Sequence, residues 1–276
     1  MLIFKNPSFV NKKPPLSFLF VYVIYKNVYF YQMQRYFVEL SYNGTHFFGW
    51  QRQPNQISVQ EEIENAFTKL NSNEPISIVG CGRTDAGVHA SKYIIHVDLQ
   101  GLIDNDQLIF KLNRILPDSI VIHSIQAVSN EMHARFKATS RTYRYFMNTQ
   151  KNPFKQDTSW YFSSNLDFEA MNKAGEFLLG TNDFTSFSKV NTDVKTNICT
   201  VSKAQWVQVD THNFYFEITA DRFLRNMVRA TVGTLLEIGL GKINPESIIT
   251  ILEEKDRGAA AISVPAHGLF LWEVLY

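Results

Sequence analysis

The sequence of 276 residues has few cysteines, and this scarcity excludes two kinds of protein. Its only cysteines, Cys81 and Cys199, lie far apart and form no CxxC pair or other metal-binding spacing. Two such residues cannot supply the disulfide framework of a small secreted protein. The histidines at positions 89, 96, 123 and 133 show no spacing typical of metal ligands. We therefore expect two reduced, buried thiols and no bound metal.

The motifs of several large enzyme classes are also missing. The sequence has no GxxxxGK(S/T) loop, no GxGxxG after an expected strand, and no nucleophile elbow with a Ser-His-Asp order. These absences argue against an NTPase, a dehydrogenase and a serine hydrolase. No cofactor is expected.

Charge of one sign does not dominate the chain. The net charge is +1, from 27 basic and 26 acidic residues, so composition alone does not indicate a polyanionic partner. A local basic surface could still bind RNA, because phosphate contacts depend on where Lys and Arg lie. The composition, 45% hydrophobic and 19% charged, is typical of a folded protein, and we find no low-complexity tract.

The apolar run near the N-terminus is short. It extends from Leu16 to Tyr25, is interrupted by Lys26, and is not followed by the small-residue cleavage site of a signal peptide. We therefore expect a cytoplasmic protein with no membrane span. Because a strand pattern starts directly at Met33, we expect residues 1–32 to be an extension from a misassigned start or a disordered tail.

Residues 33–132 carry a β-α-β-β-α-β pattern, which is typical of a ferredoxin-like half. Ser58 and Glu61 form a capping box that begins a helix, and Asp104 caps a second helix. The expected strands are 35–41, 76–80, 93–98 and 120–128. A glycine-flanked loop lies between the second and third of these strands.

Residues 140–276 again combine strand and helix patterns, after a boundary near 129–140. The expected strands are 141–147, 201–209, 214–220 and 269–275, and the expected helices are 168–178, about 223–238 and a short one after Pro245. The fold class predicted from this order is α+β, with two ferredoxin-like halves and mainly antiparallel sheets.

The loop after the second strand contains Arg83-Thr84-Asp85-Ala86-Gly87, with a further glycine at position 82. Glycines let a backbone turn sharply or approach a ligand closely, and an adjacent guanidinium favours the charged form of a carboxylate. Asp85 is therefore a candidate catalytic group. A structural turn with a surface ion pair explains the same residues equally well.

Three arginines recur on the long helix expected at 223–238. At about 100° per residue, Arg222, Arg225 and Arg229 project within about 60° of one another. Such a row can offer guanidinium groups to phosphates or to a buried carboxylate, although a solvated row of charges gives the same pattern.

Arginine and tyrosine alternate in the strand expected at 141–147. Arg141, Tyr143 and Tyr145 share one of its faces, as suits base stacking and phosphate contacts in RNA recognition. An ordinary half-buried strand has the same composition, so both interpretations stay open.

The string GCGRTDAGVHA at 80–90 resembles the active-site motif of the tRNA pseudouridine synthase A family. Further blocks resemble segments of that family in the same order, namely FGWQ at 48–51, RTYRY at 141–145, DFTSF at 183–187, FLRNMVR at 223–229 and AHGL at 266–269. The resemblance runs from about Met33 to Tyr276. Val264 departs from it, since alanine is more usual before the proline.

This resemblance implies a function and a set of site residues. It implies that the chain isomerises uridine to pseudouridine in the anticodon stem-loop of tRNA, at positions 38–40, as a homodimer without a cofactor. The two halves would meet at a central RNA-binding cleft. In the family pattern Asp85 is the essential catalytic residue, Tyr143 stacks on the target base, and Arg229 pairs with Asp85. The substrate-binding residues implied are Arg83, Arg141, Arg144, Arg222, Arg225 and Leu269.

Several mechanisms fit these residues. An ionised Asp85 could attack C1′ of the ribose, add to the uracil ring, or assist deprotonation of the ribose, and sequence does not choose among them. Two other functions would use the same features: an RNA-binding module without catalysis, and a hydrolase that opens the glycosidic bond with water.

Overall fold

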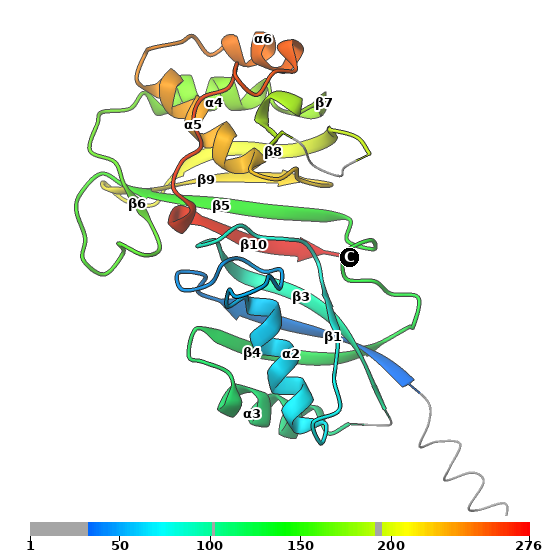
Figure 1. Ribbon diagram of the computed structural model, residues 1–276. Coiled ribbons are helices and arrows are strands. Elements are labelled where there is room, and N and C mark those ends of the chain that lie inside the picture. Colours follow the sequence, from blue (N-terminus) through cyan, green and yellow to red (C-terminus); the bar gives the residue numbers. More distant parts are fainter. Residues whose placement is uncertain (1–32, 101–102, 191–194) are drawn as a thin grey trace, which may run out of the picture.

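The computed structural model describes residues 33–100, 103–190 and 195–276. Ten strands of these ranges form one largely antiparallel open sheet with helices packed against it (Figure 1). This arrangement confirms the mixed α/β class and the mainly antiparallel pairing. The prediction for residues 1–32 lies outside the described residues.

The first part of the chain forms the elements expected from its hydrophobic pattern. They are β1 (Met33–Tyr42), α2 (Val59–Leu70), β2 (Ile78–Gly80), β3 (His89–Gln100), α3 (Asn105–Ile115) and β4 (Ile120–Val128). The Ser58 hydroxyl accepts a hydrogen bond from the Glu61 main-chain N–H, and the Asp104 carboxylate caps α3 in the same way through Gln107. Both predicted helix starts are therefore confirmed.

The second part of the chain adds further strands, helices and two short 3-10 turns. They are β5 (Ser140–Asn148), β6 (Trp160–Tyr161), α4 (Phe168–Glu176), β7 (Gly180–Asp183), η1 (Thr185–Phe187), β8 (Ile198–Gln208), β9 (Asn213–Ala220), α5 (Met227–Gly239), α6 (Ser247–Glu254), η2 (Ala266–Gly268) and β10 (Leu269–Leu275). The long helix starts four residues later than the sequence pattern predicts.

The late start of α5 has a local cause. Asn226 adopts a left-handed conformation, with φ 69°, and its side chain donates a hydrogen bond of 2.6 Å to the Ser263 hydroxyl instead of capping the helix. A left-handed residue cannot belong to a right-handed helix. Arg222 and Arg225 therefore precede α5, and the prediction that they share a helical face with Arg229 is wrong.

The described strands form a single sheet, whereas the sequence pattern suggested a sheet in each half. The strand order is β4-β1-β3-β10-β5-β9-β8-β7, with β2 paired to β3 and β6 to β5. The last strand causes the difference, because β10 runs parallel to β3 and antiparallel to β5 and so joins the two parts. Sequence periodicity identifies β10 as a strand but does not specify its partners.

The core lies on one face of this sheet. The strand register aligns the buried side chains of Leu271, Tyr143 and Ile218 across three neighbouring strands. Helix α4 covers the same face, where the ring of Phe168 stacks on Phe214 at 4.2 Å. Buried residues of both parts of the chain belong to one hydrophobic cluster, so the two parts share a continuous core.

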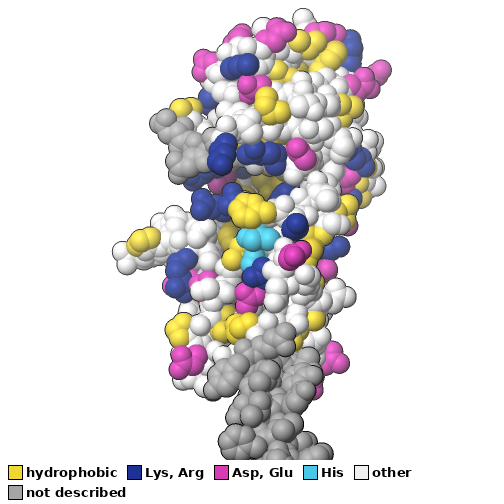
Figure 2. Space-filling view, turned by 90° about the vertical axis from the view of Figure 1, so that its right-hand side faces the viewer, with side chains coloured by type: hydrophobic (Ala, Val, Ile, Leu, Met, Phe, Trp, Pro, Cys, Tyr) yellow, Lys and Arg dark blue, Asp and Glu magenta, His cyan; other side chains and the backbone are white. Residues whose placement is uncertain are grey.

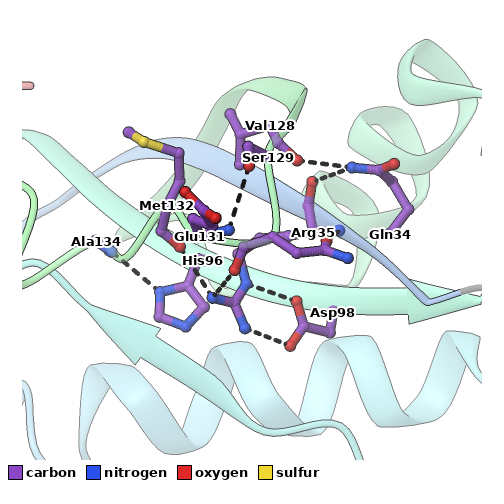
Figure 3. Close-up of polar contacts among 10 residues, drawn as sticks. Gln34, Arg35, His96, Asp98, Val128, Ser129, Glu131, Met132 and Ala134 are labelled. Carbon is purple, nitrogen blue, oxygen red and sulfur yellow. Dashed lines mark hydrogen bonds and ion pairs between the residues drawn. The ribbon is translucent and has the colours of Figure 1, made fainter.

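The segment between β4 and β5 is fastened to the sheet by polar contacts (Figure 3). The Arg35 guanidinium donates two hydrogen bonds of 2.8 Å to Asp98 and also reaches the carbonyl oxygen of Met132 at 2.9 Å. Nδ1 of His96 accepts a hydrogen bond of 3.1 Å from the main-chain N–H of Ala134. We call these five residues the clasp.

Candidate active site

Asp85 lies in the loop between β2 and β3, and main-chain hydrogen bonds hold this loop in place. The Asp85 carbonyl accepts from the N–H of Val88 at 3.2 Å, and the N–H of Cys81 donates to Ile94 on β3 at 2.9 Å. The neighbouring Thr84 is buried, and its hydroxyl is 2.8 Å from the Tyr42 hydroxyl on β1. The loop is thus tied to two strands.

The segment after β1 packs closely against the same loop, which explains the FGWQ block. Gly49 has φ +91°, and a Cβ atom there would lie 2.6 Å from the Thr84 carbonyl oxygen, so only glycine fits. The N–H of Trp50 donates to that carbonyl at 3.2 Å, and its ring stacks on Tyr93 at 4.1 Å. The FGWQ residues therefore pack against the main chain of the Asp85 loop and hold it in place.

Two guanidinium groups face the Asp85 carboxylate. Arg229 Nη1 lies 3.7 Å from Oδ2, and Arg225 Nε lies 3.6 Å from Oδ1. Arg229 is anchored from the other side, because its Nε donates a hydrogen bond of 2.7 Å to the Val264 carbonyl. Arg229 is in the first turn of α5, so the start of this helix positions the guanidinium against the Asp85 loop.

Tyr143 lies on β5 and is buried. Its ring meets the Phe223 ring edge-on at 4.9 Å. Burial raises the pKa of the Tyr143 hydroxyl, and the Cys81 thiol raises it further, so the hydroxyl is protonated at neutral pH. The negative charge of Asp85 acts in the same direction, while Arg141 opposes both.

His89 joins the Asp85 loop to the AHGL block. Its Nδ1 accepts a hydrogen bond of 3.0 Å from the Gly44 N–H, so Nε2 carries the proton and donates to the His267 carbonyl at 3.0 Å. Burial lowers the pKa of His89, in keeping with a neutral ring. We assign His89 a structural role.

An open cavity of about 610 Å³ lies next to Asp85. It is lined by Asp85, Ala86, Lys189, Val190, Arg225, Asn226, Arg229 and Arg257. In the space-filling view, Lys and Arg side chains gather around the middle of the molecule (Figure 2). A carboxylate at the wall of a basic cavity suits a negatively charged substrate.

The structure brings Asp85, Arg225 and Arg229 together, and it places other predicted residues elsewhere. Arg141 is engaged within the protein, since its guanidinium donates to the carbonyl oxygens of Cys81, Arg135 and Asp221. This network fastens the Asp85 loop to β5, which favours a positioning role.

Arg144 lies on the opposite face of β5 from Tyr143 and is engaged there in a different way. Its Nε donates to the Glu217 carboxylate, and its guanidinium lies over the Trp272 ring at 4.1 Å. These contacts favour a structural role for Arg144 on the open face of the sheet.

Three further predicted residues do not line the cavity. Arg83 is exposed and donates a hydrogen bond of 3.1 Å to the Gln51 side chain. Arg222 precedes α5, and Leu269 is buried at the start of β10, opposite Tyr145. Leu269 is thus part of the core beside the site.

Sequence reasoning missed three polar side chains that line the cavity, namely Lys189, Asn226 and Arg257. Lys189 follows the DFTSF block by two positions, so that block was a weak signal for it. Arg257 occurs in a charged stretch that resembles an exposed surface segment, and no feature of the sequence places it near Asp85.

The described residues contain no group of three or more His, Cys, Asp or Glu side chains arranged to hold a metal ion. No helix in the described ranges is long and apolar enough to span a membrane. The cavity wall offers one carboxylate and two facing guanidinium groups. The protonated Tyr143 is close enough for the charge of Asp85 to raise its pKa, but it is buried and does not itself line the cavity.

Comparison with known proteins gives a consistent result. A family model described as tRNA pseudouridine synthase matches residues 40–137 and 174–276. A tRNA pseudouridine synthase A of Parabacteroides distasonis is 51% identical over 247 residues, which cover 88% of this chain and 96% of that protein. Proteins of the same name from Bacteroides fragilis and Bacillus subtilis are 48% identical over 245 residues and 41% identical over 240 residues, covering 88% and 86% of this chain and 97% of each relative.

Proposed function

Because this chain belongs to the tRNA pseudouridine synthase family, we propose that it isomerises uridine to pseudouridine in tRNA with Asp85 as its catalytic carboxylate. One observation supports the choice of Asp85 above others. It is the carboxylate that lines the open cavity within the described residues, and two guanidinium groups face it at 3.6 and 3.7 Å. This arrangement pairs the carboxylate with two cations and places it at the wall of the cavity in which a nucleotide would bind.

The reaction breaks the N1–C1′ bond of uridine and forms a C5–C1′ bond. C5 loses a proton and N1 gains one, so substrate and product have the same atoms. Such an isomerisation needs a group that stabilises the separated ribose and base, and a path for one proton. Asp85 supplies the first by attack on C1′, by addition to uracil, or by assisting removal of a ribose proton.

Arg229 and Tyr143 have distinct roles in this proposal. Arg229 positions the Asp85 carboxylate, because its own position is fixed by the hydrogen bond to Val264. Tyr143 provides an aromatic surface for a uracil that has been swung out of the RNA. Its raised pKa keeps a proton on the hydroxyl at neutral pH.

We further propose the anticodon stem-loop, at tRNA positions 38–40, as the target, and the cytoplasm as the location. Both follow from the family resemblance. For the fold we propose that β1–β4 with α2 and α3 form one ferredoxin-like half. The antiparallel pairs of β1 with β3 and β4, and of β2 with β3, support this description.

A homodimer is the proposed assembly. In a dimer one subunit could hold the body of the tRNA while the other modifies it. Light scattering at micromolar concentration tests this, and we expect twice the mass of the 31.8 kDa chain. A fully active monomer would overturn the dimer proposal.

The function is tested by incubating purified protein with tRNA transcripts and mapping pseudouridine at nucleotide resolution. We expect the parent to convert uridine in the anticodon arm without releasing uracil. Asp85→Asn keeps the side-chain volume but removes the charge, so pseudouridine should fall below detection while tRNA affinity stays within about tenfold. Asp118→Asn, an exposed residue distant in sequence from the loop, is the matched control.

Four results would contradict this proposal. Free uracil would indicate a hydrolase, and tRNA binding without product would indicate a binding module. An Asp85→Asn variant with nearly parental activity would exclude a catalytic role for this carboxylate. A lowered melting temperature with activity retained in the folded fraction would indicate that Asp85 is structural.

A further inference from the structure

The cavity beside Asp85 carries more positive charge than its carboxylate neutralises. Its lining contains four cationic side chains, Lys189, Arg225, Arg229 and Arg257, and one carboxylate among the described residues. Asp85 faces Arg225 and Arg229, whereas neither Lys189 nor Arg257 has an acidic partner in the described part of the chain. Like charges held together repel one another, so this arrangement favours an anionic ligand.

Two side-chain hydrogen bonds hold Arg257 in place, and within the described part of the chain they use two of its five N–H donors. Its Nη1 donates to the Ala260 carbonyl at 3.0 Å, and its Nη2 donates to the Ser263 hydroxyl at 3.2 Å. The same hydroxyl accepts from Asn226 at 2.6 Å, which connects Arg257 to the start of α5. A guanidinium has five N–H donors, so about three remain for a ligand.

Lys189 complements Arg257 in both position and flexibility. Its main-chain N–H donates to the Arg225 carbonyl at 3.0 Å, which fixes the start of the side chain next to the Asp85 pair. The side chain itself is exposed and ends in a mobile ammonium group. Lys189 can therefore follow a phosphate over a range of positions.

We propose that Lys189 and Arg257 bind the backbone phosphates that flank the target uridine when this nucleotide is swung into the cavity. A uridine in a chain has a phosphodiester on each side, so a uracil held next to Asp85 brings two negative charges to the cavity. Guanidinium and ammonium groups are the usual partners of such phosphates. This assignment rests on the proposed function and extends it to the recognition of the nucleotide.

The test is a double-mutant cycle that removes the charge of a protein side chain and the charge of an RNA phosphate, singly and together. Lys189→Met and Arg257→Met are compared with the parent on tRNA assembled with a single neutral methylphosphonate, placed 5′ or 3′ of the mapped target uridine. On ordinary tRNA we expect each variant to raise KM about tenfold with a small change in kcat, and to lower the salt slope of binding by about one. On tRNA neutralised at the contacted phosphate, the same variant should lose less than about twofold relative to the parent.

Controls separate this proposal from a general charge effect. Lys69→Met removes an exposed cation of α2, and its effect should be the same on both kinds of tRNA. Melting temperatures identify any loss of folding in Arg257→Met, and Lys189→Met tests the same phosphates without altering the contacts to Ser263. For each variant, the loss from the substitution could instead multiply with the loss from the methylphosphonate at both positions. That result would overturn the proposal. A parent that forms no pseudouridine would instead refute the proposed function.

Discussion

At the scale of single residues, the two arginines that face Asp85 differ in how firmly they are held. The Arg229 side chain is 21% exposed and bonded to Val264, whereas the Arg225 side chain is 59% exposed. Arg225 and Arg229 therefore differ in exposure and anchoring although they lie at nearly the same distance from the Asp85 carboxylate. We propose that Arg229 orients Asp85 and that the more exposed Arg225 contacts RNA.

Replacing each arginine by lysine should separate these roles. Lysine cannot contact both the Val264 carbonyl and Asp85 in the planar geometry of a guanidinium, so Arg229→Lys should lower kcat about 100-fold. Arg225→Lys should mainly raise KM and change its salt dependence. Single-turnover kinetics on tRNA transcripts distinguish the two, and Arg114→Lys on the exposed side of α3 serves as control. If both changes affected only KM, Arg229 would not belong to the catalytic centre.

At the scale of elements, the clasp determines how the segment between β4 and β5 lies on the sheet. Its members come from β1, β3 and the segment itself, so it joins residues that are distant in sequence (Figure 3). Within it His96 is buried, and the nearby charges of Arg35 and His133 also disfavour a second proton on its ring.

The clasp predicts a dependence of stability on pH. Burial, together with Arg35 and His133, lowers the pKa of His96 from 6.5 to about 4, with Asp98 opposing only in part. Between these values the unfolded chain binds a proton that the folded chain does not. The free energy of unfolding should therefore fall as the pH is lowered through this window and recover as it is raised.

Unfolding in urea at several pH values between about 7 and 4.5 measures this effect. His96→Gln removes the titrating ring but keeps an acceptor for the Ala134 N–H, so the loss of stability on acidification should be smaller than in the parent. The exposed His123, changed to Gln, is the control for the removal of a histidine outside the clasp. An identical pH dependence in His96→Gln and the parent would contradict the role assigned to His96.

At the scale of the whole molecule, β10 connects the parts of the sheet that come from the two parts of the chain. It lies between β3 and β5 (Figure 1). Its Leu271 is buried and pairs with Tyr143 of β5. The hydrogen bonds of a single strand thus stabilise both parts. The Asp85 loop and α5, which supply the two sides of the candidate site, are held together by this continuous sheet.

This connection predicts that the described parts unfold together. Calorimetry should give one transition, with equal calorimetric and van't Hoff enthalpies. Leu271→Ala, which leaves a cavity between the parts, should cost about 2–5 kcal/mol and reduce hydrogen-exchange protection in β1 and β9 alike. Two separate transitions, or a loss of protection confined to one of these strands, would show that the parts are independent.

Local sequence features were sufficient to determine many of the helices and strands. Ser58 and Asp104 act as helix caps wherever the rest of the chain lies, and alternating apolar residues in β1 specify which of its faces is buried. Each of these features depends on interactions among residues close together in the chain. The Asp85 loop is different, because its local residues fit a structural turn equally well and only its resemblance to a family motif identified it as a candidate site.

Tertiary structure decided the features that depend on distant partners. The left-handed Asn226 delays the start of α5, and its side chain donates a hydrogen bond to Ser263. The spacing of apolar residues in the sequence cannot reveal that contact. The sequence predicted Arg141 as a substrate-binding residue and did not indicate Arg257. The fold instead occupies the Arg141 guanidinium with main-chain carbonyl oxygens and brings Arg257 to the wall of the cavity. A guanidinium has the same chemistry in any sequence, and its function is decided by which acceptors the folded chain brings within reach.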